Sequence, residues 1–328
     1  MPVTVPLRFQ QHFSSLLGTL QRGEDSVPAR DSRKCLLFCH SPTCVLLRSV
    51  VCMGQAPKTD GAKVFPGEAA RMAAQERYPN NSQATTLKAE IRKAIWHLLA
   101  QHGAVRFPSP HGRIPNFVGA DRAARLLREL TVWRKAHVIK LSADAPHLPI
   151  RRAALADGKI VYLAVPRLTA EKCFVELDPQ KLGSRVLSTI SLRGALKYGR
   201  LVSPREMRHT DLIICGSVAA SRDGARLGKG GGFSDLEYGL LREEGKVREL
   251  TPIITTIHPL QMILHKIPMF PHDLPVDFVI TPTEVIATRA VYPRPRGIYW
   301  DLLRDIKINA IPILRKRLRQ GGTGTRQG

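Results

Sequence analysis

The sequence predicts an α/β protein of three layers, in which helices cover both faces of a mostly parallel, Rossmann-like sheet. Short apolar runs alternate with helical or loop stretches between about residues 86 and 290, which is typical of a helix-wrapped sheet. Runs such as Asp211-Leu-Ile-Ile-Cys-Gly216 are continuously apolar, as expected of strands that are buried on both faces. Apolar residues make up 43% of the 328 residues, which is enough to bury a sizeable core.

Two amphipathic helices open this region. The first is predicted over residues 87–102, with Thr86 as its N-cap and Gly103 ending it. Its apolar stripe consists of Leu87, Ile91, Ala94, Ile95, Leu98 and Leu99. The second helix is predicted over residues 120–136. Its expected buried residues are Ala123, Ala124, Leu127 and Leu130.

Short strands and a last helix complete the α/β region. The strands are predicted at residues 138–141, 160–165, 212–216, 252–257, 276–281 and, as a further short one, 284–288. A helix is also expected directly after the glycines around residue 230, and a basic helix over residues 313–319 precedes a loose tail.

Three segments are predicted along the chain. Residues 1–85 show no sustained helical or strand period, which predicts a disordered or non-native N-terminal extension, with Met72 as the alternative first residue. Residues 86–312 form the α/β domain, and residues 313–328 form the basic C-terminal helix and tail.

The formal net charge of +23 calls for a polyanionic partner. Residues 1–71 hold nine Lys or Arg and five Asp or Glu, a net of +4, which leaves +19 for residues 72–328. Clustered basic residues would suggest nucleic acid, because they neutralise its phosphates. Here they are spread over helices, loops and both ends, which also fits a small polyanion such as ATP. A nucleic-acid partner is therefore an alternative that is not favoured.

The location of the protein follows from its apolar runs. No run approaches the roughly 20 apolar residues that span a bilayer, and residues 7–20 are too interrupted by polar side chains for a signal peptide. The sequence therefore predicts a cytoplasmic protein without membrane association.

Four of the six cysteines lie in the N-terminal extension at spacings that favour reduced thiols over a zinc site. Cys173 and Cys215 are expected in the core.

A glycine-rich loop carries the clearest chemical signal. Gly228 and Gly230-Gly-Gly232 let the backbone approach a ligand closely, and amides ahead of a helix form an anion site. Arg226 and Lys229 add positive charge, and Asp235 stands at the helix start, where a carboxylate can hold Mg²⁺. The spacing matches neither a Walker A loop nor the dinucleotide pattern. The plain alternative is a flexible glycine hinge beside a basic surface.

The loop resembles the signature of the 5-formyltetrahydrofolate cyclo-ligase family, Gly-x-Arg-Leu-Gly-x-Gly-x-Gly-Tyr-Tyr-Asp. The matching residues are Gly224, Arg226, Leu227, Gly228, Gly230, Gly232 and Asp235. Residues 87–92 resemble the family's N-terminal Lys…Arg helix, and residues 273–277 resemble its late Asp-x-x-Val-Asp segment. Four further stretches resemble the methenyltetrahydrofolate synthetase domain-containing branch: residues 113–117, 216–219, 235–238 and 281–287.

The resemblance implies an ATP- and Mg²⁺-dependent ligase. ATP would phosphorylate the formyl oxygen of 5-formyltetrahydrofolate, and attack by the N10 nitrogen would release phosphate and leave 5,10-methenyltetrahydrofolate. Arg226 and Lys229 are the implied catalytic residues, and Asp235 and Asp273 the implied Mg²⁺ ligands. The implied ATP-binding residues are Lys88, Arg92, Arg226, Leu227, Gly228, Lys229, Gly230, Gly231, Gly232, Phe233 and Ser234.

Two departures from the family pattern leave other functions open. The loop has Phe233-Ser234 where the family has Tyr-Tyr. The segment after strand 138–141 lacks the family's folate-directed glutamate, for which Asp144 or His147 are the nearest substitutes. The alternatives are an ATP-binding paralogue with a different substrate, or a non-catalytic RNA-associated protein. His258 and His265 have no partner spacing for a catalytic triad and are expected to be structural.

Overall fold

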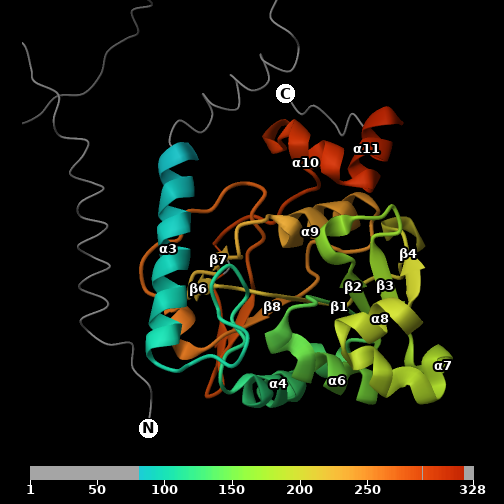
Figure 1. The fold of residues 1–328 in the computed structure, drawn as a ribbon, viewed down its shortest axis with the longest axis horizontal. Coiled ribbons are helices and arrows are strands. Elements are labelled where there is room, and N and C mark those ends of the chain that lie inside the picture. The colour runs from blue at the N-terminus through green and yellow to red at the C-terminus, as the bar shows by residue number, and fades with distance from the viewer. Residues whose placement is uncertain (1–80, 290, 321–328) are drawn as a thin grey trace, which may run out of the picture. The chain divides into compact units, whose positions relative to one another are not determined.

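An eight-stranded sheet forms the middle layer of the fold (Figure 1). The computed structural model describes residues 81–289 and 291–320. The strand order is β11-β10-β8-β5-β1-β2-β3-β4. The strands are β1 (Val138–Leu141), β2 (Ile160–Ala164), β3 (Phe174–Leu177), β4 (Arg200–Val202), β5 (Leu212–Cys215), β8 (Ile253–Thr256), β10 (Phe278–Ile280) and β11 (Val285–Ala287).

The centre of this sheet is parallel and its two ends are antiparallel. Strands β2, β1, β5, β8 and β10 pair in parallel, whereas β3 and β4 at one end and β11 at the other pair antiparallel. Every residue of β1, β5 and β8 is buried, which is why these strands do not alternate between apolar and polar residues. The predicted three-layer α/β fold with a mostly parallel sheet is confirmed.

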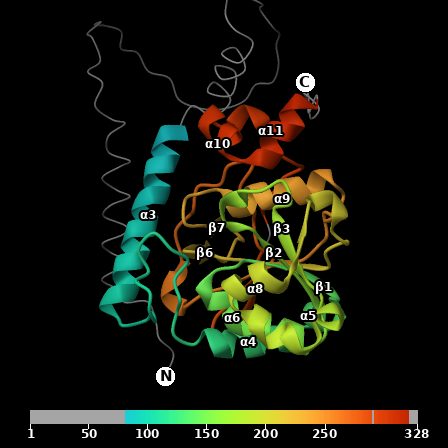
Figure 2. The ribbon, with the colours of Figure 1, turned by 45° about the vertical axis from the view of Figure 1, so that its right-hand side comes forward.

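Helices cover both faces of the sheet, because successive side chains of a strand point to opposite faces. Ile139 and Leu141 belong to one apolar core and Val138 to the other. The first core is covered by α4 (Ala120–Glu129), α5 (Thr131–Lys135), α6 (Leu148–Ala156) and α8 (Leu192–Tyr198), near α7 (Pro179–Leu182). The second is covered by α9 (Phe233–Glu243), α10 (Asp305–Ala310) and α11 (Pro312–Arg319). Figures 1 and 2 show these groups on opposite sides of the sheet.

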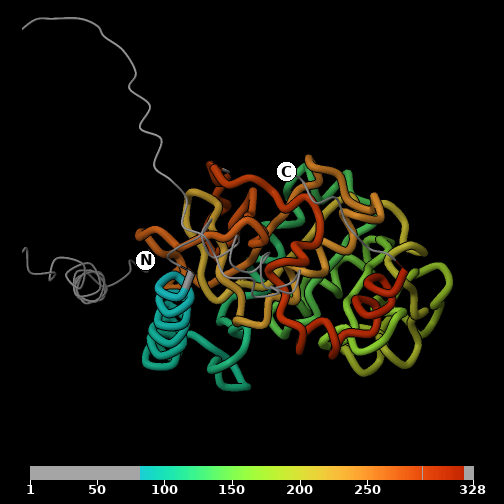
Figure 3. Tube along the Cα trace, turned by 90° about the horizontal axis from the view of Figure 1, so that it is seen from above, coloured from blue at the N-terminus to red at the C-terminus, as the bar shows by residue number. Residues whose placement is uncertain are grey.

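A long helix and a small sheet stand beside the main sheet. Helix α3 (Asn81–Gln101) buries the side chains of Ile91, Ile95 and Leu99. The small sheet has the order β7-β6-β9 and consists of β6 (Ala219–Ser221), β7 (Arg226–Leu227) and β9 (Met262–Ile263). Helix α3 is in contact with β6 and with the short 3₁₀ helix at Pro259–Gln261. Figure 3 shows α3 nearly end-on at the left of the fold.

Several predicted boundaries are wrong. The first helix begins at Asn81, so Thr86 lies inside it and residues 81–85 belong to the fold rather than to an extension. The helix predicted over residues 120–136 is two helices, because Leu130 takes an extended backbone conformation. The C-terminal helix buries Ile313 and Leu314 in the core, so it is part of the α/β body. Strands β3, β4, β6, β7 and β9 were not among the predicted ones.

Other expectations concern residues 1–80 and 321–328. The N-terminal extension up to residue 80, the alternative start at Met72, the four N-terminal cysteines and the tail lie outside the described residues. Cys173 and Cys215 are buried and unpaired, as expected. No described helix is long and apolar enough to cross a membrane.

A buried ion pair ties α9 to the centre of the sheet. The Lys140 ammonium in β1 donates to the Glu237 carboxylate in α9, and the two side chains are 3% and 11% exposed. Removing one partner of such a pair leaves a buried charge without compensation, which typically costs about 3–5 kcal/mol. The position of α9, which begins directly after the glycine-rich loop, therefore depends on this pair.

Glu237→Ala tests this dependence. We expect it to lower the free energy of unfolding by about 3–5 kcal/mol in urea titrations followed by circular dichroism. The control is Glu171→Gln, which breaks the exposed pair between Glu171 and Lys316 and should cost less than about 1 kcal/mol. Equal, small losses in both variants would contradict the anchoring role.

Candidate functional site

The site lies where the strand order reverses, at the carboxyl ends of β1 and β5. The chain leaves β1 toward β2 on one side, whereas β5 pairs with the other side of β1 and leads on to β8. Loops diverge at such a point and leave room for a ligand. Gly216, after β5, is required here: a Cβ atom would lie 2.9 Å from Ile114 and 3.1 Å from Asp144 Oδ2. The segments after β1 and β5 therefore pack directly together.

The glycine-rich loop rises beside this point from a hairpin. Strands β6 and β7 are antiparallel neighbours, and Ser221 N donates to Ala225 O across the expected turn at Asp223-Gly224. Gly230 and Gly232 have φ of 102° and 60°, a region that favours glycine. Gly232 is the N-cap of α9. The loop thus reaches the N-terminus of an 11-residue helix, where amides attract anions.

Arg226 and Asp235 form the buried base of the loop. Arg226 Nη2 donates to Asp235 Oδ1 at 2.5 Å, Nη1 to Gly216 O at 3.1 Å and Nε to Leu274 O at 3.1 Å. Asp235 Oδ1 also accepts from Leu274 N at 3.0 Å. Burial alone would raise the pKa of Asp235, but the Arg226 guanidinium holds that pKa below its ordinary value. The pair joins β7, α9, the end of β5 and the segment around Leu274.

Lys88 and Arg92 reach the site from α3. The Lys88 ammonium donates to Asp273 Oδ2 and lies 4.0 Å from the centroid of the Phe270 ring. Burial lowers the pKa of Lys88 below its ordinary value, although Asp273 opposes this shift. Arg92 Nε donates to Gly228 O at 2.7 Å. The helix therefore holds both the glycine-rich loop and the segment around Asp273.

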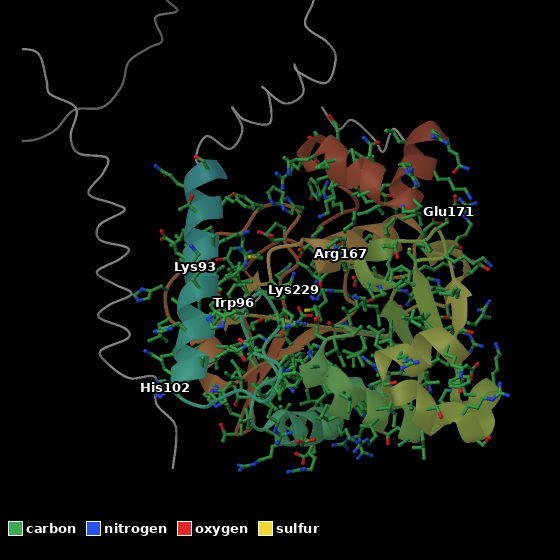
Figure 4. The ribbon with its side chains drawn as sticks, in the orientation of Figure 1. Lys93, Trp96, His102, Arg167, Glu171 and Lys229 are labelled. Carbon is green, nitrogen blue, oxygen red and sulfur yellow. The ribbon has the colours of Figure 1, made fainter. Side chains whose placement is uncertain are left out.

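Two further lysines lie at the loop, one within it and one on helix α10. Lys229 Nζ donates to Asp144 Oδ1 at 2.8 Å, and the two side chains are 45% and 23% exposed. Figure 4 shows Lys229 near the middle of the fold, between α3 and the main sheet. Lys307 Nζ, from α10, donates to Gly231 O at 2.9 Å and lies 5.2 Å from the centroid of the Phe233 ring. Cationic groups thus approach the loop from α3, from α10 and from the loop itself.

A cavity of about 310 Å³ opens beside Lys229. It is lined by Pro108, His111, Gly112, Arg113, Ile114, Asn116, Asp144, Ala145 and Lys229. A larger and more open hollow of about 570 Å³ lies around Trp133 and Asp157 and shares no lining residue with the glycine-rich loop. The smaller cavity is the better candidate for a substrate, because the segment after β1 and the glycine-rich loop meet there.

Positive charge is in excess at the site. Five cationic side chains, those of Lys88, Arg92, Arg226, Lys229 and Lys307, face three carboxylates, those of Asp144, Asp235 and Asp273. Asp235 and Asp273 both act electrostatically on Lys88 and on Arg92, which shows that these charges form one cluster. A surplus of fixed cations beside a helix N-terminus suits a polyphosphate.

The predicted site residues converge with few exceptions. Lys88, Arg92, Arg226, Lys229, Asp235 and Asp273 gather around the glycine-rich loop. Leu227 is buried in β7, and Phe233 and Ser234 form the first turn of α9 rather than part of the loop. His147 is fully buried, and burial lowers its pKa to about 4. His258 Nδ1 accepts from Leu260 N, a structural role as expected.

Some site residues were missed in the sequence. Lys307 lies in a short helix far along the chain, and nothing in its local pattern marks it. Arg113 and Asn116 were noted only within a stretch that resembles the family. The bond between Lys229 and Asp144 joins residues 85 positions apart, so no local spacing predicts it.

The comparisons with known proteins agree on one family. A model of the 5-formyltetrahydrofolate cyclo-ligase family matches residues 84–282. The methenyltetrahydrofolate synthase domain-containing protein of Danio rerio is 37% identical over 235 residues, which are 70% of this chain and 61% of that protein. The Bos taurus protein of the same name is 34% identical over 237 residues, 71% of this chain and 62% of that protein. The matched segments thus span about three fifths of these relatives.

A solved structure is also similar to the chain. It is the NMR structure of Aquifex aeolicus 5,10-methenyltetrahydrofolate synthetase, with a TM-score of 0.40 and 19% identity, covering 62% of this chain and 93% of that one.

The ion pair of Asp235 gives the protein a pH dependence. Because the folded-state pKa of Asp235 lies below its unfolded value, the stability it contributes is complete above about pH 4 and is lost as the pH falls through the folded value. Asp235→Asn should therefore be less stable than the wild type at pH 7, and the difference in Tm should stay constant down to about pH 4 and narrow as the pH falls further. Thermal unfolding of both proteins measures this difference. A difference in Tm that does not narrow below about pH 4 would contradict the assignment.

Proposed function

The chain belongs to the 5-formyltetrahydrofolate cyclo-ligase family, and from this premise we propose that it is an ATP-dependent ligase acting on 5-formyltetrahydrofolate. ATP would phosphorylate the formyl oxygen, and the N10 nitrogen would then attack the activated carbon and release phosphate, which closes the ring of 5,10-methenyltetrahydrofolate. The methenyltetrahydrofolate synthase domain-containing relatives support the proposed substrate class.

One observation carries the proposal: the glycine-rich loop is surrounded by more cations than carboxylates and lies next to a cavity. The amides of Gly228–Gly232 precede the N-terminus of α9, and Lys229 projects from the same loop into the lining of the cavity. Phosphoryl transfer needs positioning and neutralisation of charge more than covalent participation by the protein. A phosphate on the loop and a heterocycle in the cavity would be held side by side.

The cationic residues divide into two roles. Arg226 is 3% exposed and three of its nitrogens already donate to Asp235, Gly216 O and Leu274 O. We assign it the role of a positioning residue that holds the loop. Lys229 is exposed on the loop and is the proposed phosphate ligand that stabilises the transition state. Lys88 and Arg92 add positive charge from the side of α3.

The donor set fits a Mg²⁺ ion that arrives with the nucleotide. The described residues hold no group of three or more His, Cys, Asp or Glu side chains that could form a complete metal cage. Mg²⁺ at nucleotide sites is usually held by one or two carboxylates together with phosphates and water. Asp235 and Asp273 belong to one charge cluster and would be its ligands. When bound, the ion would neutralise charge on the phosphates.

A second candidate keeps ATP but changes the heterocycle. The segment after β1 presents Ser142 and Asp144, and Asp144 is bonded to Lys229 and Ser142 rather than turned only toward the cavity. A shorter carboxylate in place of the family's glutamate alters the distance to a bound ring. The RNA-associated alternative rests on the net charge and on the Phe233-Ser234 pair, and the site gives it no specific support.

Turnover tests the proposed function. Protein incubated with Mg²⁺-ATP and 5-formyltetrahydrofolate should produce the near-ultraviolet absorbance of the methenyl product in step with ADP release. Absence of product at saturating ATP would contradict the folate assignment. ATP consumption with another formylated heterocycle, and none with the folate, would favour the second candidate.

Lys229→Ala tests the role of the loop. We expect kcat/KM to fall by about 10²-fold, the usual effect of removing one donor that stabilises a transition state. The matched control is Lys93→Ala, since Lys93 is exposed on the same helix as Lys88. Steady-state kinetics at varied ATP should leave the control close to wild type. Full activity of Lys229→Ala would remove the lysine from the mechanism.

A further inference from the structure

We propose that the ion pair between Lys229 and Asp144 couples the nucleotide loop to the cavity. In the ligand-free protein Asp144 holds Lys229; when phosphates bind to the loop, Lys229 moves to them, and the freed Asp144 carboxylate accepts hydrogen bonds from N–H groups of the ring in the cavity. This inference rests on the proposed function, because it states that the nucleotide binds first and thereby prepares the cavity for the second ligand of the same site.

The pair joins the two halves of the site. Lys229 lies in the loop between β7 and α9, and Asp144 follows β1, 85 positions earlier in the chain. Both side chains line the cavity of about 310 Å³. The Nζ to Oδ1 distance of 2.8 Å shows that Asp144 holds one of the three N–H donors of this ammonium, so a phosphate that binds Lys229 competes with Asp144 for its charge. A change in the position of Lys229 in the loop therefore alters the hydrogen bonding of Asp144 in the cavity.

Among the three cations of the described cluster that pair with carboxylates, Lys229 is the most exposed. Arg226 is buried with three hydrogen-bond acceptors, and the pair of Lys88 and Asp273 is only 7% and 13% exposed. The side chains of Lys229 and Asp144 are 45% and 23% exposed, so water screens their attraction. A polyphosphate, with several negative charges, attracts Lys229 more strongly than a single screened carboxylate does.

Asp144 does not lose all its partners when Lys229 leaves. Ser142 Oγ donates to Oδ2 of Asp144, the oxygen that does not contact Lys229. The close approach of Gly216 also limits where that oxygen can move. Oδ1 is then the oxygen set free, and Asp144 supplies the one carboxylate among the residues that line the cavity. The released group is a hydrogen-bond acceptor of fixed position, suited to a ring that carries N–H donors.

Nucleotide binding to variants tests the exchange directly. The probe is the imido analogue of ATP, which is not hydrolysed, titrated with Mg²⁺ by calorimetry. Asp144→Asn removes the carboxylate that competes for Lys229, so we expect it to bind the analogue about two- to fivefold more tightly than wild type, the range expected for a screened pair. Lys229→Ala should bind it more weakly. In the double variant, Asp144→Asn should add no further change, because no lysine is left to release.

Two controls separate this effect from general electrostatics and from misfolding. Glu171→Gln removes one negative charge far from Lys229 (Figure 4) and should leave the affinity unchanged. Thermal unfolding of each variant checks that it is folded. Reciprocally, saturation with the analogue should tighten 5-formyltetrahydrofolate binding in the wild type by a factor that Asp144→Asn loses.

The outcomes distinguish failure of the Lys229–Asp144 exchange from failure of the proposed function. Equal affinity of wild type and Asp144→Asn for the analogue would overturn the exchange while leaving nucleotide binding intact. Tightening by Asp144→Asn that persists without Lys229 would overturn it as well, because the effect would then be long-range. No binding of the analogue by the folded wild type would contradict the proposed function itself.

Discussion

The buried ion pair between Arg226 and Asp235 is the contact on which the rest of the site depends. A guanidinium in a nearly dry environment is stable only when its donors are used, and here they reach the carboxylate and two backbone carbonyls. Those partners belong to α9, to the end of β5 and to the segment around Leu274. One side chain thus fixes three parts of the chain against the hairpin that carries the glycine-rich loop.

Because Arg226 is held in place, the rest of the loop, from Gly228 to Gly232, can adapt to a ligand. After Arg226, the loop contains Lys229 and the positive-φ residues Gly230 and Gly232, and it leads into α9. The side chains of Lys88, Arg92 and Lys307 approach the site from neighbouring helices. Without a ligand, the ammonium groups of Lys88 and Lys229 are satisfied by Asp273 and Asp144. The cluster is therefore held together by its own carboxylates and retains a net positive charge for an anionic ligand.

Sequence patterns predicted the parts that depend on local chemistry. Strand β1 was located to the residue from its apolar residues, although Lys140 lies among them, and the loop was recognised from its glycines and charges. Strands β3 and β4 were not predicted; they pair with each other, and Glu176 accepts a hydrogen bond from Arg200 across them, a contact that only the fold creates. The bond between Lys88 and Asp273 spans 185 positions and is created only by the fold, so no spacing could reveal it.

The most direct test of the central claim is a crystal structure of the protein with the imido analogue of ATP and Mg²⁺. We expect the phosphates to lie against the amides of Gly228–Gly232, with Lys229 Nζ turned from Asp144 to a phosphate oxygen and the pair of Arg226 and Asp235 unchanged. A nucleotide bound away from this loop, with Lys229 still on Asp144, would contradict the assignment of the glycine-rich loop as the phosphate site.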